Sequence, residues 1–171
     1  QRSAIDASAS AFGGMFRVQG DDVRQLAIAS DHSLARSDGW YWVLHGTPVS
    51  KTGECVAKVR AQHGQNAELW EDFTACTTAF EEVIASDADP RDVIRENQRL
   101  LDFIGVVPTP SARFIAAVED SGGAAKISGA GAVAGENGGA ILVYQPDHDA
   151  MTMLLSKYPD RQSDRRQVAQ E

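Results

Sequence analysis

Residues 121–140 read SGGAAKISGAGAVAGENGGA, and the interpretation of the whole chain depends on this stretch. It contains seven glycines, with one cation at Lys126 and one anion at Glu136. Glycine lets the backbone take positive φ and approach a ligand closely, and consecutive free N–H groups in such a turn bind anions. The stretch matches neither the phosphate loop that ends in Gly-Lys-Ser/Thr nor the Gly-x-Gly-x-x-Gly turn. Taken alone, it is better explained as a tight turn between two strands than as a phosphate loop or a flexible linker.

Strands are predicted on both sides of a central block of helices. The aromatic and β-branched run GWYWVLHGTP, residues 39–48, is the clearest strand, and GGAILVYQ, residues 138–145, is another. Residues 11–20 predict a short strand closed by a turn, whereas residues 21–30 fit either a second short strand or one helical turn. The near-continuous apolar run in 39–48 indicates a strand buried on both faces, or nearly so.

Helical periodicity and capping residues predict the remaining elements. The predicted helices occupy residues 50–63, 66–86, 89–105, 109–123 and 148–159, and residues 159–171 form a polar tail, either disordered or a short frayed helix. Strands come first, then helices, then a strand pair around the glycines. This order predicts an α+β fold in which helices pack on one face of a small antiparallel sheet.

Composition limits the classes of function. The chain has 171 residues, enough for one domain, and its net charge of −8 argues against a general nucleic-acid binder. No apolar run approaches the ~18 residues that a membrane span needs, and no signal peptide is visible. The two cysteines, Cys55 and Cys76, fit neither a zinc site nor a disulfide framework, so we expect reduced thiols on helices of a cytoplasmic protein.

Two stretches resemble the C-terminal half of the GHMP small-molecule kinases, the mevalonate kinases in particular. In that family a helix carrying N…LL…LGV precedes a second helix and then a K-[LI]-[TS]-G-A-G-G-G-G loop between two strands. The matching residues here are Asn97, Leu100, Leu101, Ile104, Gly105 and Val106 in the helix and Lys126, Ile127, Ser128, Gly129, Ala130 and Gly131 in the loop. The loop departs from the family pattern at Ala132 and Val133.

Two further stretches agree with this resemblance. QRSAIDASASAFGG, residues 1–14, resembles the family segment PSGIDNAVSTYGG, with Ala4 and Ala7 as departures. The matching residues are Ser3, Ile5, Asp6, Ser10, Gly13 and Gly14. In residues 46–60, Lys51-Thr52 occupies the place of the family's [ST]-T pair. Four stretches in the family's order are far more specific than any one of them.

The resemblance implies a ferredoxin-like C-terminal GHMP kinase domain over residues 1–158. The first ~20 residues would belong to the active-site segment that joins this domain to an N-terminal half. The family's phosphate loop, its substrate lysine and its magnesium carboxylate lie in that half. ATP and Mg²⁺ are therefore implied cofactors whose ligands lie mostly outside this chain. We assign no metal-ligating residue here, and we expect residues 1–171 alone to bind ATP weakly and to lack kinase turnover.

The resemblance also implies roles for individual residues. Asp6 matches the aspartate that contacts the acceptor hydroxyl, although IDASAS also fits a helix N-cap. Residues 128–131 (Ser128, Gly129, Ala130 and Gly131) would lie near the ATP phosphates. Ser3 and Thr52 would contact the substrate, although Thr52 is at least as good a helix N-cap. Lys126 is expected at a strand end, in solvent or in a surface ion pair.

Two classes of function follow from these observations. The first is an ATP-dependent kinase for the hydroxyl of a small hydroxy acid, mevalonate before others, whose partner is the missing N-terminal half. A phosphomevalonate kinase or a decarboxylase would be a variant within the superfamily. The second is a stand-alone ferredoxin-like module that binds a ligand or a subunit without catalysis. Apolar surface left open by a missing half would favour a homodimer.

Overall fold

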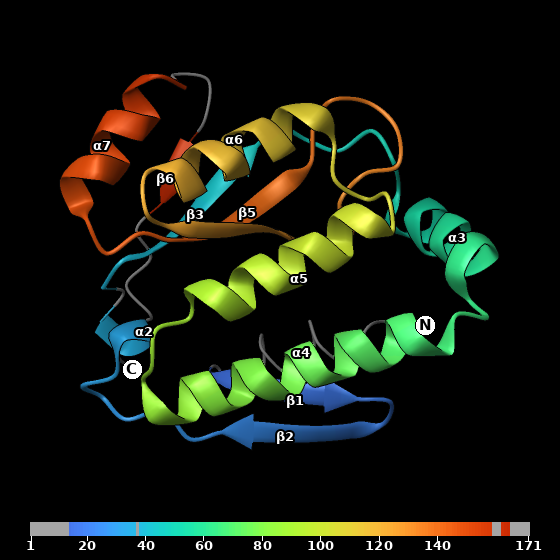
Figure 1. Cartoon of the computed structure of the whole chain (residues 1–171), viewed down its shortest axis with the longest axis horizontal. Helices are drawn as coiled ribbons and strands as arrows, with labels where there is room; N and C mark the ends of the chain where they lie inside the picture. The colour runs from blue at the N-terminus through green and yellow to red at the C-terminus, as the bar shows by residue number, and fades with distance from the viewer. Residues whose placement is uncertain (1–13, 37, 159–161, 165–171) are drawn as a thin grey trace.

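The computed structural model describes residues 14–36, 38–158 and 162–164 (Figure 1). The strands are β1 (Met15–Gln19), β2 (Asp22–Leu26), β3 (Trp40–His45), β4 (Ala124–Ser128), β5 (Gly139–Tyr144) and β6 (Gln162–Asp164). The helices are α2 (Ser33–Arg36), α3 (Thr52–His63), α4 (Ala67–Ser86), α5 (Arg91–Phe103), α6 (Thr109–Asp120) and α7 (His148–Ser156).

The main sheet has four antiparallel strands in the order β4-β5-β3-β6. Its register aligns Tyr41 with Val143 of β5, and it aligns Val43 with Ile141 in the next row. Side chains alternate between the faces of a strand, so these pairs lie on one face. All four side chains are buried, which identifies this face as the core side.

Helices α6 and α7 cover that face, and Figure 1 shows α6 lying across the sheet. Phe114 and Val118 of α6 are fully buried against the sheet, and Met151 and Leu154 of α7 complete the cluster. The opposite face is more open, because Trp42 and Leu44 of β3 are 38% and 51% exposed. The strand expected to be buried on nearly both faces is thus fully buried on only one.

Helix α5 lies along β4, at the edge of the sheet. The side-chain amide oxygen of Gln98 accepts a hydrogen bond of 2.9 Å from the backbone N–H of Ile127, and Arg95 donates to the carbonyl of Gly123. A bare edge strand would expose these groups to pairing with another chain. At the end of the same edge, Ile94 of α5 packs with Trp40 and Ala124. Helix α5 therefore closes the edge of the sheet beside the glycine-rich loop.

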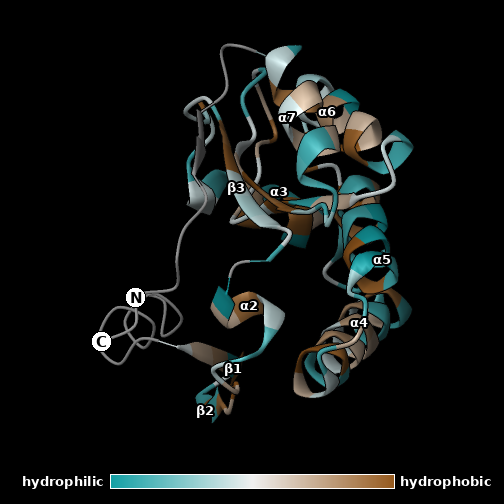
Figure 2. Cartoon of the chain, turned by 90° about the vertical axis from the view of Figure 1, so that its left-hand side faces the viewer, coloured by the Kyte–Doolittle hydropathy of each residue, from teal (hydrophilic) through white to brown (hydrophobic). Residues whose placement is uncertain are grey.

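Strands β1 and β2 form a separate hairpin that is attached to α4. Arg17 and Arg24 both pair with Glu81 of α4, and their hydrogen bonds lower the pKa of that carboxyl group. The hairpin settles the ambiguous segment 21–30, which contains a second strand. Figure 2 shows α4 to α7 forming a continuous helical side, with the hairpin on the other side.

The predicted α+β fold, with a small antiparallel sheet and the ferredoxin-like arrangement, is confirmed. The polar tail differs from expectation at Gln162–Asp164, which form β6 and pair with β3 in place of the expected disorder or frayed helix. Short polar segments gain strand structure where a sheet edge offers free N–H and C=O groups.

Among residues 14–36, 38–158 and 162–164, no helix combines the length and the apolar character required to cross a bilayer.

Candidate functional site

The glycine-rich loop connects β4 to β5, as the sequence predicts. Gly129, Gly131, Gly135 and Gly139 all have positive φ, with values of 97°, 63°, 78° and 79°. L-residues rarely adopt this region, so the glycines are required by the path of the chain. The turn is thus irregular and built on glycine, as an anion-binding loop requires.

The second half of the loop is held by backbone and serine contacts. Ala132 donates its N–H to the carbonyl of Val106 at 2.9 Å. The N–H groups of Val133 and Ala134 both donate to the hydroxyl oxygen of Ser50, at 3.2 and 3.0 Å. Ser50 is 8% exposed, and its hydroxyl donates in turn to the carbonyl of Ala134. Three consecutive N–H groups are therefore used by the fold itself.

The first half of the loop contrasts with this. In the described part of the chain, no hydrogen bond uses the backbone N–H of Gly129, Ala130 or Gly131. A Cβ added at Gly129 would meet no atom within 4 Å, so the space beside it is open. Three consecutive unused donors beside open space provide a potential cradle for an anion.

Gly131 marks the boundary between the two halves. A Cβ there would lie 2.1 Å from the carbonyl oxygen of Val106. The buried thiol of Cys55 on α3 lies 3.8 Å from the carbonyl oxygen of Gly131. Val106 follows α5, so the helix and the loop that carry the family resemblance meet directly at this glycine.

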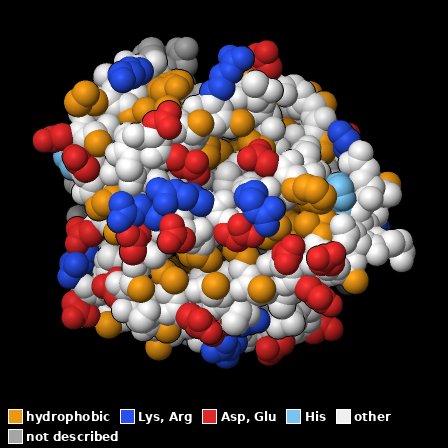
Figure 3. Space-filling model, viewed as in Figure 1, with side chains coloured by type: hydrophobic (Ala, Val, Ile, Leu, Met, Phe, Trp, Pro, Cys, Tyr) orange, Lys and Arg blue, Asp and Glu red, His pale blue; other side chains and the backbone are white. Residues whose placement is uncertain are grey.

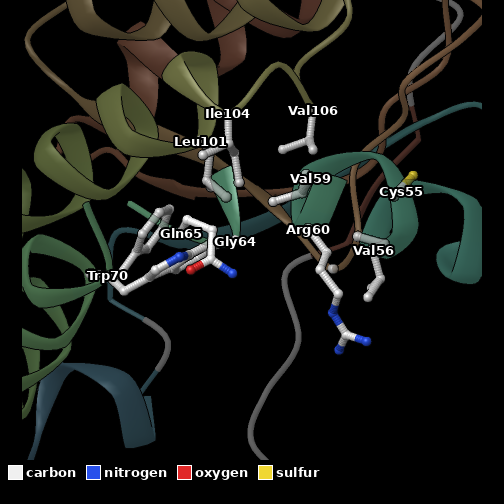
Figure 4. A pocket seen from close by; sticks show the side chains of 13 residues that line it. Cys55, Val56, Val59, Arg60, Gly64, Gln65, Trp70, Leu101, Ile104 and Val106 are labelled. Carbon is white, nitrogen blue, oxygen red and sulfur yellow. The ribbon is translucent and has the colours of Figure 1, made fainter. Parts of the chain in front are cut away.

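A cavity of about 640 Å³ lies beside the open half of the loop. Gly129 and Ala130 form part of its wall, and α3, α4, α5 and the residues that follow α3 and α5 supply the rest. Figure 4 shows Val59, Trp70, Leu101 and Ile104 around it, among mostly apolar side chains. A pocket of this size and polarity is typical of small-molecule sites.

Arg60 of α3 is the charged residue of this lining. In Figure 4 its guanidinium extends away from the apolar side chains. The arginines of α5 contrast with it, because Arg91 pairs with Asp89, Arg95 with Asp92 and Arg99 with Glu96. Figure 3 shows side chains of Lys or Arg next to those of Asp or Glu across the middle of this face. Solvated pairs of this kind leave little net field, so Arg60 is the better placed cation for an anionic ligand.

Lys126 is half-buried in the middle of β4 and forms no ion pair in the described part of the chain, which differs from the lysine expected at a strand end, in solvent or in a surface ion pair. Its side chain lines a second cavity of about 160 Å³, with Cys76, Asn97 and Leu142. Burial lowers the pKa of its ammonium group. Burial also raises the pKa of the Cys76 thiol, to whose sulfur Asn97 donates at 3.7 Å. The cause is α4 and α5, which enclose the outer face of β4 at this point.

The predicted site residues are only partly brought together. Ser128 ends β4 and leads directly into Gly129, Ala130 and Gly131, so these four form one continuous segment. Thr52 is the first residue of α3 and is exposed, and Lys51 precedes it as the capping residue, so Thr52 is not the N-cap. Ser3 and Asp6 lie outside the described residues.

Ser50 and Cys55 were not assigned to the loop from the sequence. A serine just before a helix is normally explained as its cap, and a lone cysteine in a helix as core. Ser50 instead binds the backbone of residues 133 and 134, more than 80 positions further along the chain. The only sequence signal for their role is that both residues lie in the stretch 46–60, which resembles the kinases.

Magnesium ligands were not assigned from the sequence. In the described part of the chain, no group of three or more His, Cys, Asp or Glu side chains is arranged to hold a metal ion. The unused N–H groups of residues 129–131 fit a phosphate, but they do not fit a cation.

Comparison with solved structures identifies this architecture. The Leishmania major mevalonate kinase, solved with R-mevalonate, has a TM-score of 0.71 and 17% identity over 94% of this chain and 49% of its own. The Methanococcus jannaschii mevalonate kinase has a TM-score of 0.65 and 18% identity over 92% and 47%. The Streptococcus pneumoniae phosphomevalonate kinase has a TM-score of 0.55 and 15% identity, over 72% of this chain and 38% of its own.

The chain thus spans less than half the length of these kinases, and it has the fold of their C-terminal domain. No protein-family model matches the sequence, and no curated protein matches it significantly. At this level of identity the likeness shows the fold, and the activity has to be argued from the site.

Proposed function

We propose that this chain is the C-terminal part of an ATP-dependent kinase that phosphorylates the hydroxyl of a small hydroxy acid, mevalonate before others. The observation that supports this most strongly is the set of unused N–H groups at Gly129, Ala130 and Gly131, beside the cavity. They occur at the positions where the sequence resembles the kinase loop, within a fold shared with mevalonate kinases.

The loop residues have a definite role in this proposal. The N–H groups of residues 129–131, with the Ser128 hydroxyl, bind phosphate oxygens and stabilise the charge that accumulates on them. Mg-ATP, when bound, supplies the phosphoryl group. The contacts of Val106 and Ser50 hold the second half of the loop, directly after these donors.

The acceptor side depends on residues beyond the loop. The Asp6 carboxylate accepts the proton of the acceptor hydroxyl, a role that suits a carboxylate. Ser3 and the exposed Thr52 at the start of α3 contact the acceptor. Thr52 follows Ser50 by two positions, so a contact there would lie near the part of the chain that holds the loop.

The remaining parts of the site belong to the N-terminal half, supplied by the same or another chain in the cytoplasm. This half contributes the magnesium carboxylate and the substrate lysine. Residues 1–171 alone then bind ATP weakly and do not turn over.

A coupled ADP-release assay on the complete protein tests the proposal. We expect ADP release that depends on mevalonate, with phosphomevalonate as the comparison acceptor. Faster ADP release with phosphomevalonate than with mevalonate would instead assign the protein as a phosphomevalonate kinase. No ADP release with either acceptor would contradict a kinase of this class.

The assignment of Asp6 has its own test. In the complete protein, Asp6→Asn should lower kcat by at least about 100-fold with little change in the affinity for ATP, because the amide cannot accept the proton. Unchanged kcat would remove Asp6 from the mechanism and leave the capping role.

A second candidate is a non-catalytic subunit-interaction module, possible as a homodimer. It is favoured by exposed apolar side chains at Trp42, Leu44, Val49 and Val56. Sedimentation of residues 1–171 separates the two functions. A stable dimer with no ADP release from the complete protein supports the module, whereas activity of the complete protein supports the kinase.

A further inference from the structure

The Lys126 side chain lies in a small cavity that the proposed kinase reaction does not use. The cavity measures about 160 Å³ and lies between α4, α5 and the outer face of β4 and β5. A water molecule occupies roughly 30 Å³ in the liquid, so the space corresponds to about five waters. It is separate from the larger cavity, since no lining residue is common to both.

Lys126 brings a charge into this cavity without a visible counter-charge. In the described part of the chain Lys126 forms no ion pair, whereas every arginine of α5 does. The Lys126 ammonium group is half-buried, and the water that it loses there is not compensated by an opposite charge. Among the described residues, Lys126 therefore lacks the negative charge that would balance its ammonium group.

The other residues that line the cavity indicate which ligand could supply this negative charge. Phe80, Val93, Ile94 and Leu142 supply apolar walls. Asn97 supplies an amide whose only described hydrogen bond is the long contact to the Cys76 sulfur at 3.7 Å. The Thr77 hydroxyl also lines the cavity, but it already donates to the carbonyl of Phe73. The remaining groups are one cation, one amide donor and apolar walls, and they match a ligand with one negative charge, two acceptor oxygens and a short aliphatic tail. A phosphate dianion would leave charge unbalanced and would find too few donors.

We propose that this cavity binds a small monocarboxylate, with the carboxylate on the ammonium of Lys126 and the tail against Phe80 and Leu142. Asn97 donates to the second carboxylate oxygen after giving up its weak contact with Cys76. The site is distinct from the glycine loop and does not depend on the kinase proposal.

Thermal unfolding of the complete protein with butyrate as the probe tests this site. Butyramide is the neutral control ligand, and chloride keeps the ionic strength constant. Because a ligand that binds only the folded state stabilises it, butyrate should raise the unfolding midpoint saturably and butyramide should not. Lys126→Met should abolish the rise, and Lys58→Met, at an exposed lysine of α3, should retain it.

A second measurement covers the case in which Lys126→Met fails to fold. Lysines of the complete protein are ¹³C-dimethylated, and the Lys126 resonance is assigned from Lys126→Arg. Butyrate should shift that resonance saturably, whereas the Lys58 resonance should stay in place. A midpoint rise that persists in Lys126→Met, an equal rise with butyramide, or an unmoved Lys126 resonance would each overturn the carboxylate site. None of these results depends on kinase activity.

Discussion

The two halves of the glycine loop differ in what their backbone donors do. The N–H groups of Ala132, Val133 and Ala134 all bind protein oxygens, from Val106 and Ser50. Those of residues 129–131 bind none in the described part of the chain. Both halves are small and irregular, so the sequence alone does not separate them.

This difference indicates that the two halves of the loop have different roles. The second half fixes the loop to Val106, which follows α5, and to Ser50 in the turn before α3, whereas the donors of the first half are unused. Substitutions in the two halves should therefore separate stability from ligand binding.

Gly131→Ala should have the largest effect on stability. Its Cβ would lie 2.1 Å from the Val106 carbonyl oxygen, at a φ of 63°. We expect the free energy of unfolding to fall by about 3 kcal/mol, from strain and a steric clash at the boundary of the two halves. Denaturant unfolding of the complete protein measures this. A loss within about 0.5 kcal/mol would show that the loop is not fixed to Val106.

Ser50→Ala should have the next largest effect. It removes the acceptor of two N–H groups from a buried position, and we expect a loss of about 2 kcal/mol. Thr52→Ala is the matched control, since Thr52 is exposed, and its stability should change by less than about 0.5 kcal/mol. If Thr52 contacts the acceptor, its variant should instead raise KM for mevalonate. Equal losses of stability in both variants would contradict the role of Ser50.

Gly129→Ala should change ligand binding more than stability. Nothing lies within 4 Å of the added Cβ, so only the φ of 97° is unfavourable, at about 1 kcal/mol. The methyl group would occupy the space assigned to the phosphates, and we expect Kd for ATP to rise about tenfold, or ~1.4 kcal/mol. Isothermal titration of the complete protein checks this. An unchanged Kd would place the phosphates elsewhere.

Lys126→Met, on the strand before the loop, should have the smallest effect and the opposite sign. In buffer without carboxylates, removing a half-buried charge that has no opposite charge beside it should stabilise the protein by about 1 kcal/mol. Burial lowers the pKa of Lys126 in the folded state. Between that pKa and the unfolded value of about 10.4, the unfolded chain binds the proton and the folded chain does not.

The stability of the unsubstituted protein therefore rises with pH across this window. The advantage of Lys126→Met should shrink as the pH approaches about 10.4, as urea midpoints at several pH values will show. Lys157→Met, at an exposed lysine, is the control and should show no such convergence. A constant difference at all pH values would contradict the buried ammonium.

Local signals in the sequence account for much of the fold. The apolar stripe of α5, the aromatic run of β3 and the apolar run of β5 are visible without a structure, and the run of β5 places the glycines directly before a strand. The position of Lys126 is not visible, because it depends on how α4 and α5 pack over the face of β4. The role of Ser50 is hidden for the same reason, since its partners are more than 80 residues away. Long-range contacts of this kind have no local signature.

The central claim is that the first half of the loop binds phosphate. Amide NMR of the complete protein during a titration with Mg-ATP tests it most directly. We predict large shifts at Gly129, Ala130 and Gly131, and small shifts at Ala132, Val133 and Ala134, whose N–H groups stay bound to the protein. Shifts confined to the second half, or absent from residues 129–131 at saturation, would contradict the claim.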